Sequence, residues 1–131
     1  MKIIEQQNII KKIKLRKITF NDYKAITELQ ICCFVGMKPW SESQFKNMLT
    51  NFPEGQLCIL YGKKIIASSC CLIINFDDYN ESSPWNELTD SGNISNHNLY
   101  GDTLYGMEIM VDPKFQGMKL SRRLYEARKE L

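Results

Sequence analysis

Apolar and polar residues alternate along residues 104–111, where β-forming side chains are frequent. One face of this segment would carry Tyr105, Met107, Ile109 and Val111, and the other Leu104, Gly106, Glu108 and Met110. A period of two over a run of β-formers is typical of a strand in a covered sheet. Pro113 cannot donate a hydrogen bond to a neighbouring strand, so we expect the strand to end near Asp112.

An amphipathic repeat follows this strand. Its apolar residues recur at i, i+4, i+7 and i+11 and are Leu120, Leu124, Ala127 and Leu131. This spacing predicts a helix that begins close to Gly117, with charged residues on its other faces. A strand that turns tightly into a helix leaves backbone N–H groups without partners where the helix dipole favours negative charge. The turn is therefore a candidate phosphate site.

The first third of the chain predicts a strand and two helices. Residues 1–12 read as a loosely held lead-in, and residues 13–19 alternate as an edge strand would. Asn21 or Asp22 can cap the next helix. The inward face of that helix would carry Ile26, Leu29 and Cys33.

The second of these helices has a well-marked start. Ser41 and Gln44 form a capping box, and Trp40 and Phe45 occupy the positions of a hydrophobic staple. The core-facing residues would be Phe45, Met48, Leu49 and Phe52, with Pro53 ending the helix. In the alternative interpretation, Trp40 lines a ligand pocket.

A hairpin and a long polar segment fill the middle of the chain. Residues 56–61 and 64–75 are apolar strands joined tightly at Gly62 and Lys63. Residues 76–101 are acidic and rich in amides, and they are too long for an ordinary connection. Such segments are usually functional or disordered.

Composition narrows the class of protein. A length of 131 residues suits one domain. A formal net charge of +2 favours neither nucleic acid nor membrane as a partner, because both require a concentrated basic face. No run is apolar and long enough for a signal peptide or a membrane span, so we expect a cytoplasmic protein.

The cysteines point to the same compartment. They show no CxxC spacing and lie in predicted helices or strands, which favours buried thiols of a reducing compartment over metal ligands. They are Cys32, Cys33, Cys58, Cys70 and Cys71.

Residues 111–124, VDPKFQGMKLSRRL, resemble the acetyl-CoA signature of the GCN5-related N-acetyltransferase (GNAT) family. That signature is a strand ending in V-x-P, followed by Q/R-x-x-G-x-G/A on the turn into a helix. Gln116 and Gly117 match the start of the turn, whereas Lys119 and Ser121 stand where glycine, and glycine or alanine, are usual. Lys119 would project away, add a cation, or block the approach of a pyrophosphate.

This resemblance implies an α/β (α+β) fold with a mixed, mainly antiparallel sheet flanked by helices. The chain, residues 1–131, would be a single partial acetyltransferase-like domain that stops after the third helix. Within the family, the sequence of residues 37–131 is most similar to acetyltransferase-like domains that precede a carbon–nitrogen hydrolase domain. This chain contains no such hydrolase domain.

The resemblance also implies a site. Acetyl-CoA would lie against the end of the strand at 104–111, with its pyrophosphate on backbone N–H groups of the turn. The implied cofactor-binding residues are Ile109, Met110, Val111, Gln116, Gly117, Met118, Lys119, Leu120 and Ser121. Glu108 matches a position from which many members draw a general base; alternatively it is an exposed or ion-paired glutamate. The group that protonates the leaving thiolate would lie beyond residue 131.

The acceptor would be a small-molecule or lysine-like amine. In the family the segment at 76–101 would lie where the acceptor enters, and its acidic residues would attract a cation or merely solvate a loop. These residues are Asp77, Asp78, Glu81, Glu87 and Asp90. His97, the sole histidine, is expected to be a loop residue rather than a base.

Two functions stay open at this point. The first is N-acetyl transfer to a primary amine, and the second is a catalytically inactive acyl-CoA-binding or interaction module. In either case the strand at 104–111 would leave an unpaired edge, through which we expect a homodimer.

Overall fold

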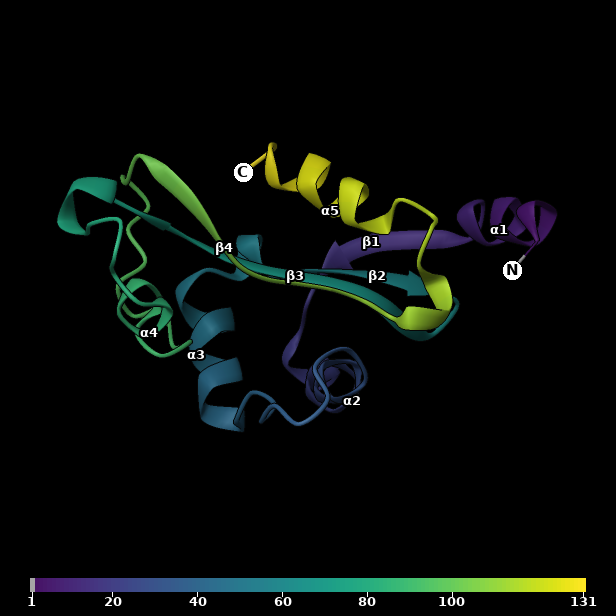
Figure 1. Cartoon of the computed structure of the whole chain (residues 1–131), viewed down its shortest axis with the longest axis horizontal. Coiled ribbons are helices and arrows are strands. Elements are labelled where there is room, and N and C mark those ends of the chain that lie inside the picture. Colours follow the sequence, from purple (N-terminus) through teal and green to yellow (C-terminus); the bar gives the residue numbers. More distant parts are fainter. Residues whose placement is uncertain (1) are drawn as a thin grey trace.

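The computed structural model describes residues 2–131 as one antiparallel sheet with helices on both faces (Figure 1). The strand order is β1-β2-β3-β4, with β1 Ile13–Lys17, β2 Leu57–Tyr61, β3 Lys64–Ile74 and β4 Thr103–Val111. The helices are α1 Ile3–Ile10, α2 Tyr23–Cys33, α3 Glu42–Asn51, α4 Trp85–Thr89 and α5 Leu120–Arg128. The expected sheet and its flanking helices are confirmed.

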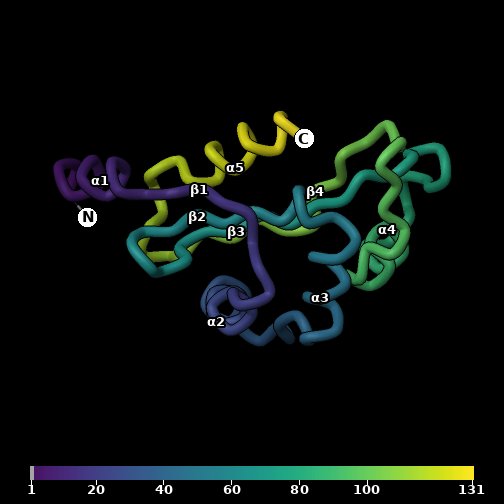
Figure 2. The backbone as a smooth tube through the Cα atoms, turned by 180° about the vertical axis from the view of Figure 1, so that it is seen from behind, coloured from purple at the N-terminus to yellow at the C-terminus, as the bar shows by residue number. Residues whose placement is uncertain are grey.

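Each face of the sheet has its own core. Helices α2 and α3 lie on one face and α5 on the other, whereas α1 lies beyond the end of β1, as the view from behind also shows (Figure 2). Ile26 of α2 and Phe45 of α3 are buried in the first core, and Leu124 of α5 is buried in the second. Burying one such side chain stabilises the fold by about 1.5–3 kcal/mol. The central strand β3 is therefore buried along nearly its whole length.

The lead-in differs from its prediction. Residues 3–10 form helix α1, and none of its residues is fully buried. Ile9 and Ile10 at its end pack against the core beneath α5. Its isoleucines stand only at its two ends, so no continuous apolar stripe marked a helix. The remaining residue of the lead-in, Met1, lies outside the described part of the chain.

The two helix starts behave differently. At α3 the predicted capping box is present: Ser41 Oγ accepts from the Gln44 N–H at 3.1 Å, and Gln44 Oε1 accepts from the Ser41 N–H at 2.9 Å. Asp22 does precede α2, but its carboxylate accepts from the Thr19 N–H and pairs with Arg16 at 2.7 Å. The Arg16 hydrogen bond lowers the pKa of Asp22.

The segment at 76–101 folds back over the sheet instead of forming an open loop. It contains α4, and Ile94 is fully buried in the core beside α3. His97 Nδ1 accepts a hydrogen bond from the Ile73 N–H at 3.0 Å, and its ring stacks on Phe52 at 4.1 Å. Burial lowers the pKa of His97. His97 lies outside the helices and strands, as expected for a loop residue.

Three predictions about the C-terminal half and the cysteines need correction. Helix α5 begins at Leu120 rather than near Gly117, and Leu131 lies beyond it, 45% exposed. Cys32 is exposed because it lies on the outer side of α2, and Cys33 is half-buried. Burial raises the pKa of Cys58 to about 11, as expected for an inert thiol.

Within residues 2–131, no helix has the length and apolar character needed to cross a bilayer.

Candidate functional site

A β-bulge in β4 decides where Glu108 points. Cys70 of β3 faces Glu108, but its neighbour Cys71 faces Gly106, so Met107 is an extra residue on β4. An extra residue reverses the alternation beyond it. The predicted faces are therefore wrong past this point: Met107 and Met110 both pack into the core beside α2 and α3. Glu108 faces α2 as well.

Glu108 is held by a buried glutamine. Gln30 Nε2 lies 3.3 Å from both carboxylate oxygens of Glu108, and Gln30 Oε1 accepts from the Trp40 N–H at 2.9 Å. Burial raises the pKa of Glu108 to about 7, while the side chains of Gln30 and Trp40 act in the opposite direction. The Trp40 indole N–H favours the charged form of the Glu108 carboxyl group. It does so without a hydrogen bond of good geometry, since Trp40 Nε1 has no hydrogen-bond partner within residues 2–131.

These contacts bear on the two interpretations of Glu108. The side chain is half-buried, and no ion pair to it exists in the described chain. The interpretation as an exposed or ion-paired glutamate is therefore wrong. Two other titratable groups lie near it, Cys70 on β3 and Cys33 on α2, and burial raises the pKa of both.

Glu108 lies in a cleft of about 870 Å³. Its walls come from α2, from α3 and the loop before it, from α4 and the turn after it, and from β4. They include Phe34, Met37, Lys38, Pro39, Trp40, Gln44, Trp85, Asn86, Ser91, Met107 and Ile109. Trp40 and Trp85 stack with their ring centroids 5.9 Å apart. Trp40 is buried in the same core as Phe45, as the staple predicts, and it also lines the cleft, so both of its interpretations apply.

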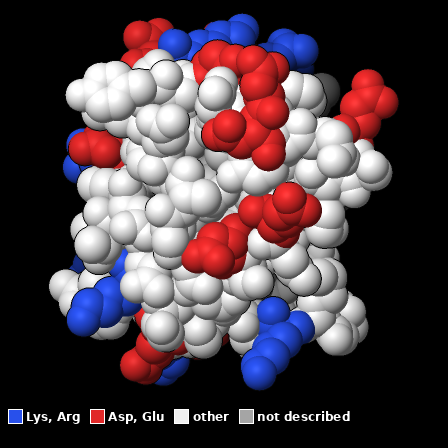
Figure 3. Space-filling view, turned by 90° about the vertical axis from the view of Figure 1, so that its left-hand side faces the viewer, with Lys and Arg blue, Asp and Glu red and all other residues white. Residues whose placement is uncertain are grey.

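The acidic residues of the segment at 76–101 do not line this cleft. They are exposed, and acidic side chains gather on the end of the molecule where α4 lies (Figure 3). Only Lys38 and Glu108 are charged among the residues around the cleft. Any steering by the acidic residues would act at a distance rather than by contact.

The turn after β4 carries a row of unpaired backbone donors. Residues 113–115 form a 3₁₀ turn, after which Gly117 has φ +86°. Within the described chain, the backbone N–H groups of residues 116–122 have no acceptor. Consecutive unpaired N–H groups at the start of a helix suit an anion. A Cβ atom at Gly117 would lie 3.9 Å from its nearest neighbour outside the adjoining residues, Gln6 Nε2, so the approach to the turn is open.

The structure brings together most of the predicted cofactor residues. Two small cavities, of about 380 and 270 Å³, flank the turn and are lined by Ile109, Met110, Val111, Gln116, Gly117, Lys119, Leu120 and Ser121, together with other residues. Met118 is separate, because its side chain is buried under α5 and lines the groove on the other side of that helix. The side chain of Leu120 is also nearly fully buried, so only backbone atoms of these two residues are placed to hold a ligand.

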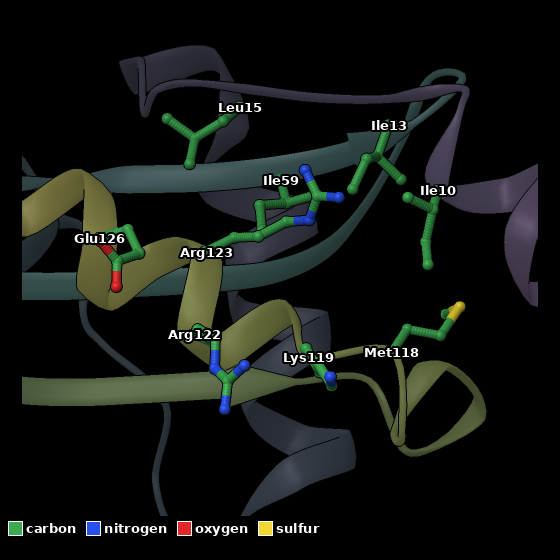
Figure 4. Close-up of a pocket in the computed structure, with 9 residues that line it drawn as sticks. All are labelled: Ile10, Ile13, Leu15, Ile59, Met118, Lys119, Arg122, Arg123 and Glu126. Carbon is green, nitrogen blue, oxygen red and sulfur yellow. The ribbon is translucent and has the colours of Figure 1, made fainter.

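Lys119 adopts a backbone conformation that glycine normally supplies. Its φ is +60°, in the left-handed region, which accounts for the usual glycine at this position of the signature. Its side chain is exposed and borders both the turn and a groove of about 530 Å³ between α5 and β1. In that groove Lys119 lies with Arg122 and Arg123 on α5, opposite Ile13 of β1 (Figure 4).

Several residues around Glu108 were not predicted from the sequence as part of the site. Gln30 follows Ile26 by four positions and therefore lies on the apolar face of α2, which is a signal that could have identified it. Trp85 and Arg128 could not be identified from neighbouring residues, because each contacts β4 from a segment about 20 positions away in the chain. In residues 2–131 there is no group of three or more His, Cys, Asp or Glu that could hold a metal ion.

Known proteins resemble this chain in sequence and in fold. The chain matches no family model. It is 46% identical over 121 residues to the "Probable hydrolase YhcX" of Bacillus subtilis, a match that spans 92% of this chain and 24% of that protein. It is 34% identical over 123 residues to the "Uncharacterized N-acetyltransferase YkwB" of Bacillus subtilis, across 91% of this chain and 54% of that protein.

Two solved structures share the fold. The loading GNATL domain of CurA from Lyngbya majuscula superposes with a TM-score of 0.73 at 17% identity, over 87% of this chain and 55% of that one. The GphF GNAT-like decarboxylase in complex with isobutyryl-CoA gives a TM-score of 0.73 at 19% identity, over 86% of this chain and 55% of that one.

The chain has the GNAT fold. It spans 24% and 54% of the lengths of the two Bacillus subtilis relatives and 55% of the CurA domain chain.

Proposed function

We propose that this chain is the acyl-CoA-binding part of an N-acetyltransferase, which moves an acetyl group from acetyl-CoA to a primary amine. One observation carries the proposal. Glu108, with a pKa of about 7, lies in a cleft beside the second half of β4, and β4 leads directly into the turn with unpaired N–H groups. A base and an anion-binding turn on the same strand are what acyl transfer from a coenzyme A thioester requires.

The turn fits the pyrophosphate of acetyl-CoA. Residues 116–122 offer backbone donors, and the positive end of the α5 dipole adds to their attraction for phosphate. Lys119 would add a cation beside them. The GphF structure contains isobutyryl-CoA, which supports a coenzyme A thioester as the ligand of this fold. Acetyl-CoA would supply the activated acetyl group.

Glu108 would act as the general base. An alkylammonium must lose a proton before its nitrogen can form an amide, and a carboxylate with a pKa of about 7 can accept that proton near neutral pH. The nitrogen loses two protons over the whole reaction. One goes to Glu108, and the other protonates the coenzyme A thiolate that leaves when the carbon–sulfur bond breaks. Gln30 would keep the carboxylate turned into the cleft.

The cleft favours an amine on an uncharged, apolar body. Its walls are mainly aromatic and aliphatic, and its volume far exceeds that of an amino group. Trp85 offers a partly exposed ring for stacking, and Lys38 would repel a polycation. We therefore propose an arylalkylamine-like acceptor, rather than a lysine-like amine.

The second candidate is an inactive acyl-CoA-binding module. It is favoured by Lys119 and Ser121, which border the cavity at the turn where the signature usually has glycine, and glycine or alanine. Calorimetric titration with acetyl-CoA tests both candidates, and absence of binding would argue against both. Thioester consumption with phenethylamine, spermidine and a lysine peptide then separates them. Turnover that is lost in Glu108→Gln with acetyl-CoA binding retained supports the enzyme, whereas binding without turnover supports the module.

We also propose a homodimer through the edge of β4. This strand is at the end of the sheet, and Leu104 on it is 38% exposed. An unpaired edge invites strand addition, and a lysine on it prevents pairing. Leu104→Lys should convert a dimer to a monomer in light scattering, whereas Leu15→Lys on the opposite edge strand, β1, should not. A monomeric wild-type protein at high concentration would disprove the dimer.

The thiols support a reducing compartment such as the cytoplasm. Cys58, Cys70 and Cys71 are buried and unpaired. An oxidising compartment would be expected to use such residues in disulfides. Fractionation of cells that express the tagged full-length protein would test this location.

A further inference from the structure

A buried arginine lies behind the bulge that carries Glu108. Arg128, on the last turn of α5, is only 9% exposed and approaches the sheet from the face opposite the cleft. Its Nη2 donates to the carbonyl oxygens of Cys70 at 3.0 Å and Glu108 at 3.3 Å. These two residues face each other where the register between β3 and β4 shifts. One guanidinium group therefore ties both strands together at the bulge.

The chain leaves room for this arginine. A Cβ atom at Gly106 would lie 2.5 Å from Arg128 Nη1, so any other residue at position 106 would displace the guanidinium group. Gly106 is the bulge neighbour that pairs with Cys71. The ring of Tyr125 lies 5.5 Å from the guanidinium carbon on the helix side. The position is thus specific to a residue with the reach and shape of arginine.

Stability alone does not account for a charge in this place. Arg128 has no carboxylate partner within residues 2–131, and its buried Nε has no hydrogen-bond partner there. A buried charge without a counterion is costly, and an apolar side chain of similar volume is often at least as stable. What the guanidinium group adds is directional bonding to two carbonyl groups of the bulge.

We infer that Arg128 is a positioning residue, which holds the β4 bulge and thereby keeps the Glu108 side chain directed into the cleft. It acts through the backbone of Glu108 and touches neither the cleft nor the turn. Because it lies on the helix that begins at the anion-binding turn, it also joins that turn to the proposed base through α5. The catalytic consequence rests on the proposed function, but the structural consequence does not.

The test compares Arg128→Met with Lys129→Met, an exposed neighbour on the same helix end. Carbon-13 NMR of the Glu108 carboxyl group measures its pKa, and hydrogen exchange measures the protection of the Glu108 amide. We expect Arg128→Met to lower the pKa of Glu108 toward its ordinary value and to accelerate exchange at the bulge. Lys129→Met should change neither. A wild-type titration and wild-type exchange in folded Arg128→Met would overturn the inference.

A second variant covers the case in which Arg128→Met does not fold. Gly106→Ala leaves the charge in place but pushes the guanidinium group away, so it should reproduce both effects. Where Arg128→Met does fold, adding Gly106→Ala to it should have no further effect, because the group that Gly106→Ala displaces is absent. Additive effects of the two changes would contradict the inference.

Kinetics separate this inference from the proposed function. If amine acetylation is found, Arg128→Met should lower kcat on the order of tenfold to a hundredfold, with the KM for acetyl-CoA unchanged. An equal loss in kcat and in acetyl-CoA affinity would mean that α5 as a whole had moved, which would contradict a role at Glu108. If no amine is acetylated, the proposed function fails, while the titration of Glu108 still decides the role of Arg128.

Discussion

Gln30 Nε2 lies 3.3 Å from both carboxylate oxygens of Glu108, although the two residues are 78 positions apart in the chain. The amide donates to the carboxylate from α2, while the same side chain accepts from the backbone N–H of Trp40. One glutamine therefore fixes both the proposed base and the wall of the cleft in which it lies.

Replacing Gln30 by leucine should raise the pKa of Glu108 above about 7. A hydrogen bond to the carboxylate favours the charged form, so its loss favours the protonated form. If Glu108 is the base, the acidic limb of the profile of kcat against pH should move to higher pH. The exposed Glu28 on the same helix provides the control, and Glu28→Gln should leave the profile unchanged. A shift to lower pH in Gln30→Leu would contradict this assignment.

Replacing Glu108 by glutamine should stabilise the fold at pH 8. The folded-state pKa of Glu108 is about 7, above its ordinary value of 4.5, so the folded state holds its proton more tightly than the unfolded state. The contribution of Glu108 to the free energy of unfolding is fully present below pH 4.5 and is lost as the pH rises through 7. The change is on the order of 3 kcal/mol.

Urea denaturation of the wild type and Glu108→Gln across this range measures the difference. The two free-energy curves should diverge between pH 4.5 and 7. Asp22 does not interfere, because its pKa is lowered and its own contribution is lost at more acidic pH. Parallel curves would show that Glu108 titrates alike in the folded and unfolded states.

Lys119→Gly should be more stable than Lys119→Ala by about 1 kcal/mol. Position 119 has a positive φ, which costs a residue with a Cβ roughly 1–2 kcal/mol and costs glycine nothing. Lys129 is a matched control, because it is also exposed but has φ −65°. There the order should reverse, with Lys129→Ala more stable than Lys129→Gly. Thermal unfolding of the four variants gives both differences.

Trp85→Leu should weaken acceptor binding without affecting acetyl-CoA. Trp85 stacks on Trp40 and forms part of the cleft wall, but it does not line the cavities at the turn. We expect the KM for an arylalkylamine to rise about tenfold, which corresponds to the roughly 1.4 kcal/mol expected from the loss of one aromatic contact. Calorimetry with acetyl-CoA should give the wild-type affinity. An unchanged KM would mean that the acceptor lies elsewhere.

Local patterns in the sequence determined most of the secondary structure. The apolar runs in residues 57–61 and 64–74, the capping box at Ser41, and the apolar repeat at Leu120 and Leu124 each depend on residues only a few positions apart. The candidate phosphate turn was predicted for the same reason, since Pro113 and Gly117 act on their own backbone. Helix α1 escaped prediction because its isoleucines lie only at its ends.

The tertiary structure alone decided how the site is built. The sequence predicted an unbroken alternation through residues 104–111, and only the pairing of β4 with β3 reveals the extra residue at Met107. The raised pKa of Glu108, its bond to Gln30 and the support from Arg128 come from three separate segments. Burial and register depend on which segments meet in space, and a short stretch of sequence carries no record of its distant neighbours.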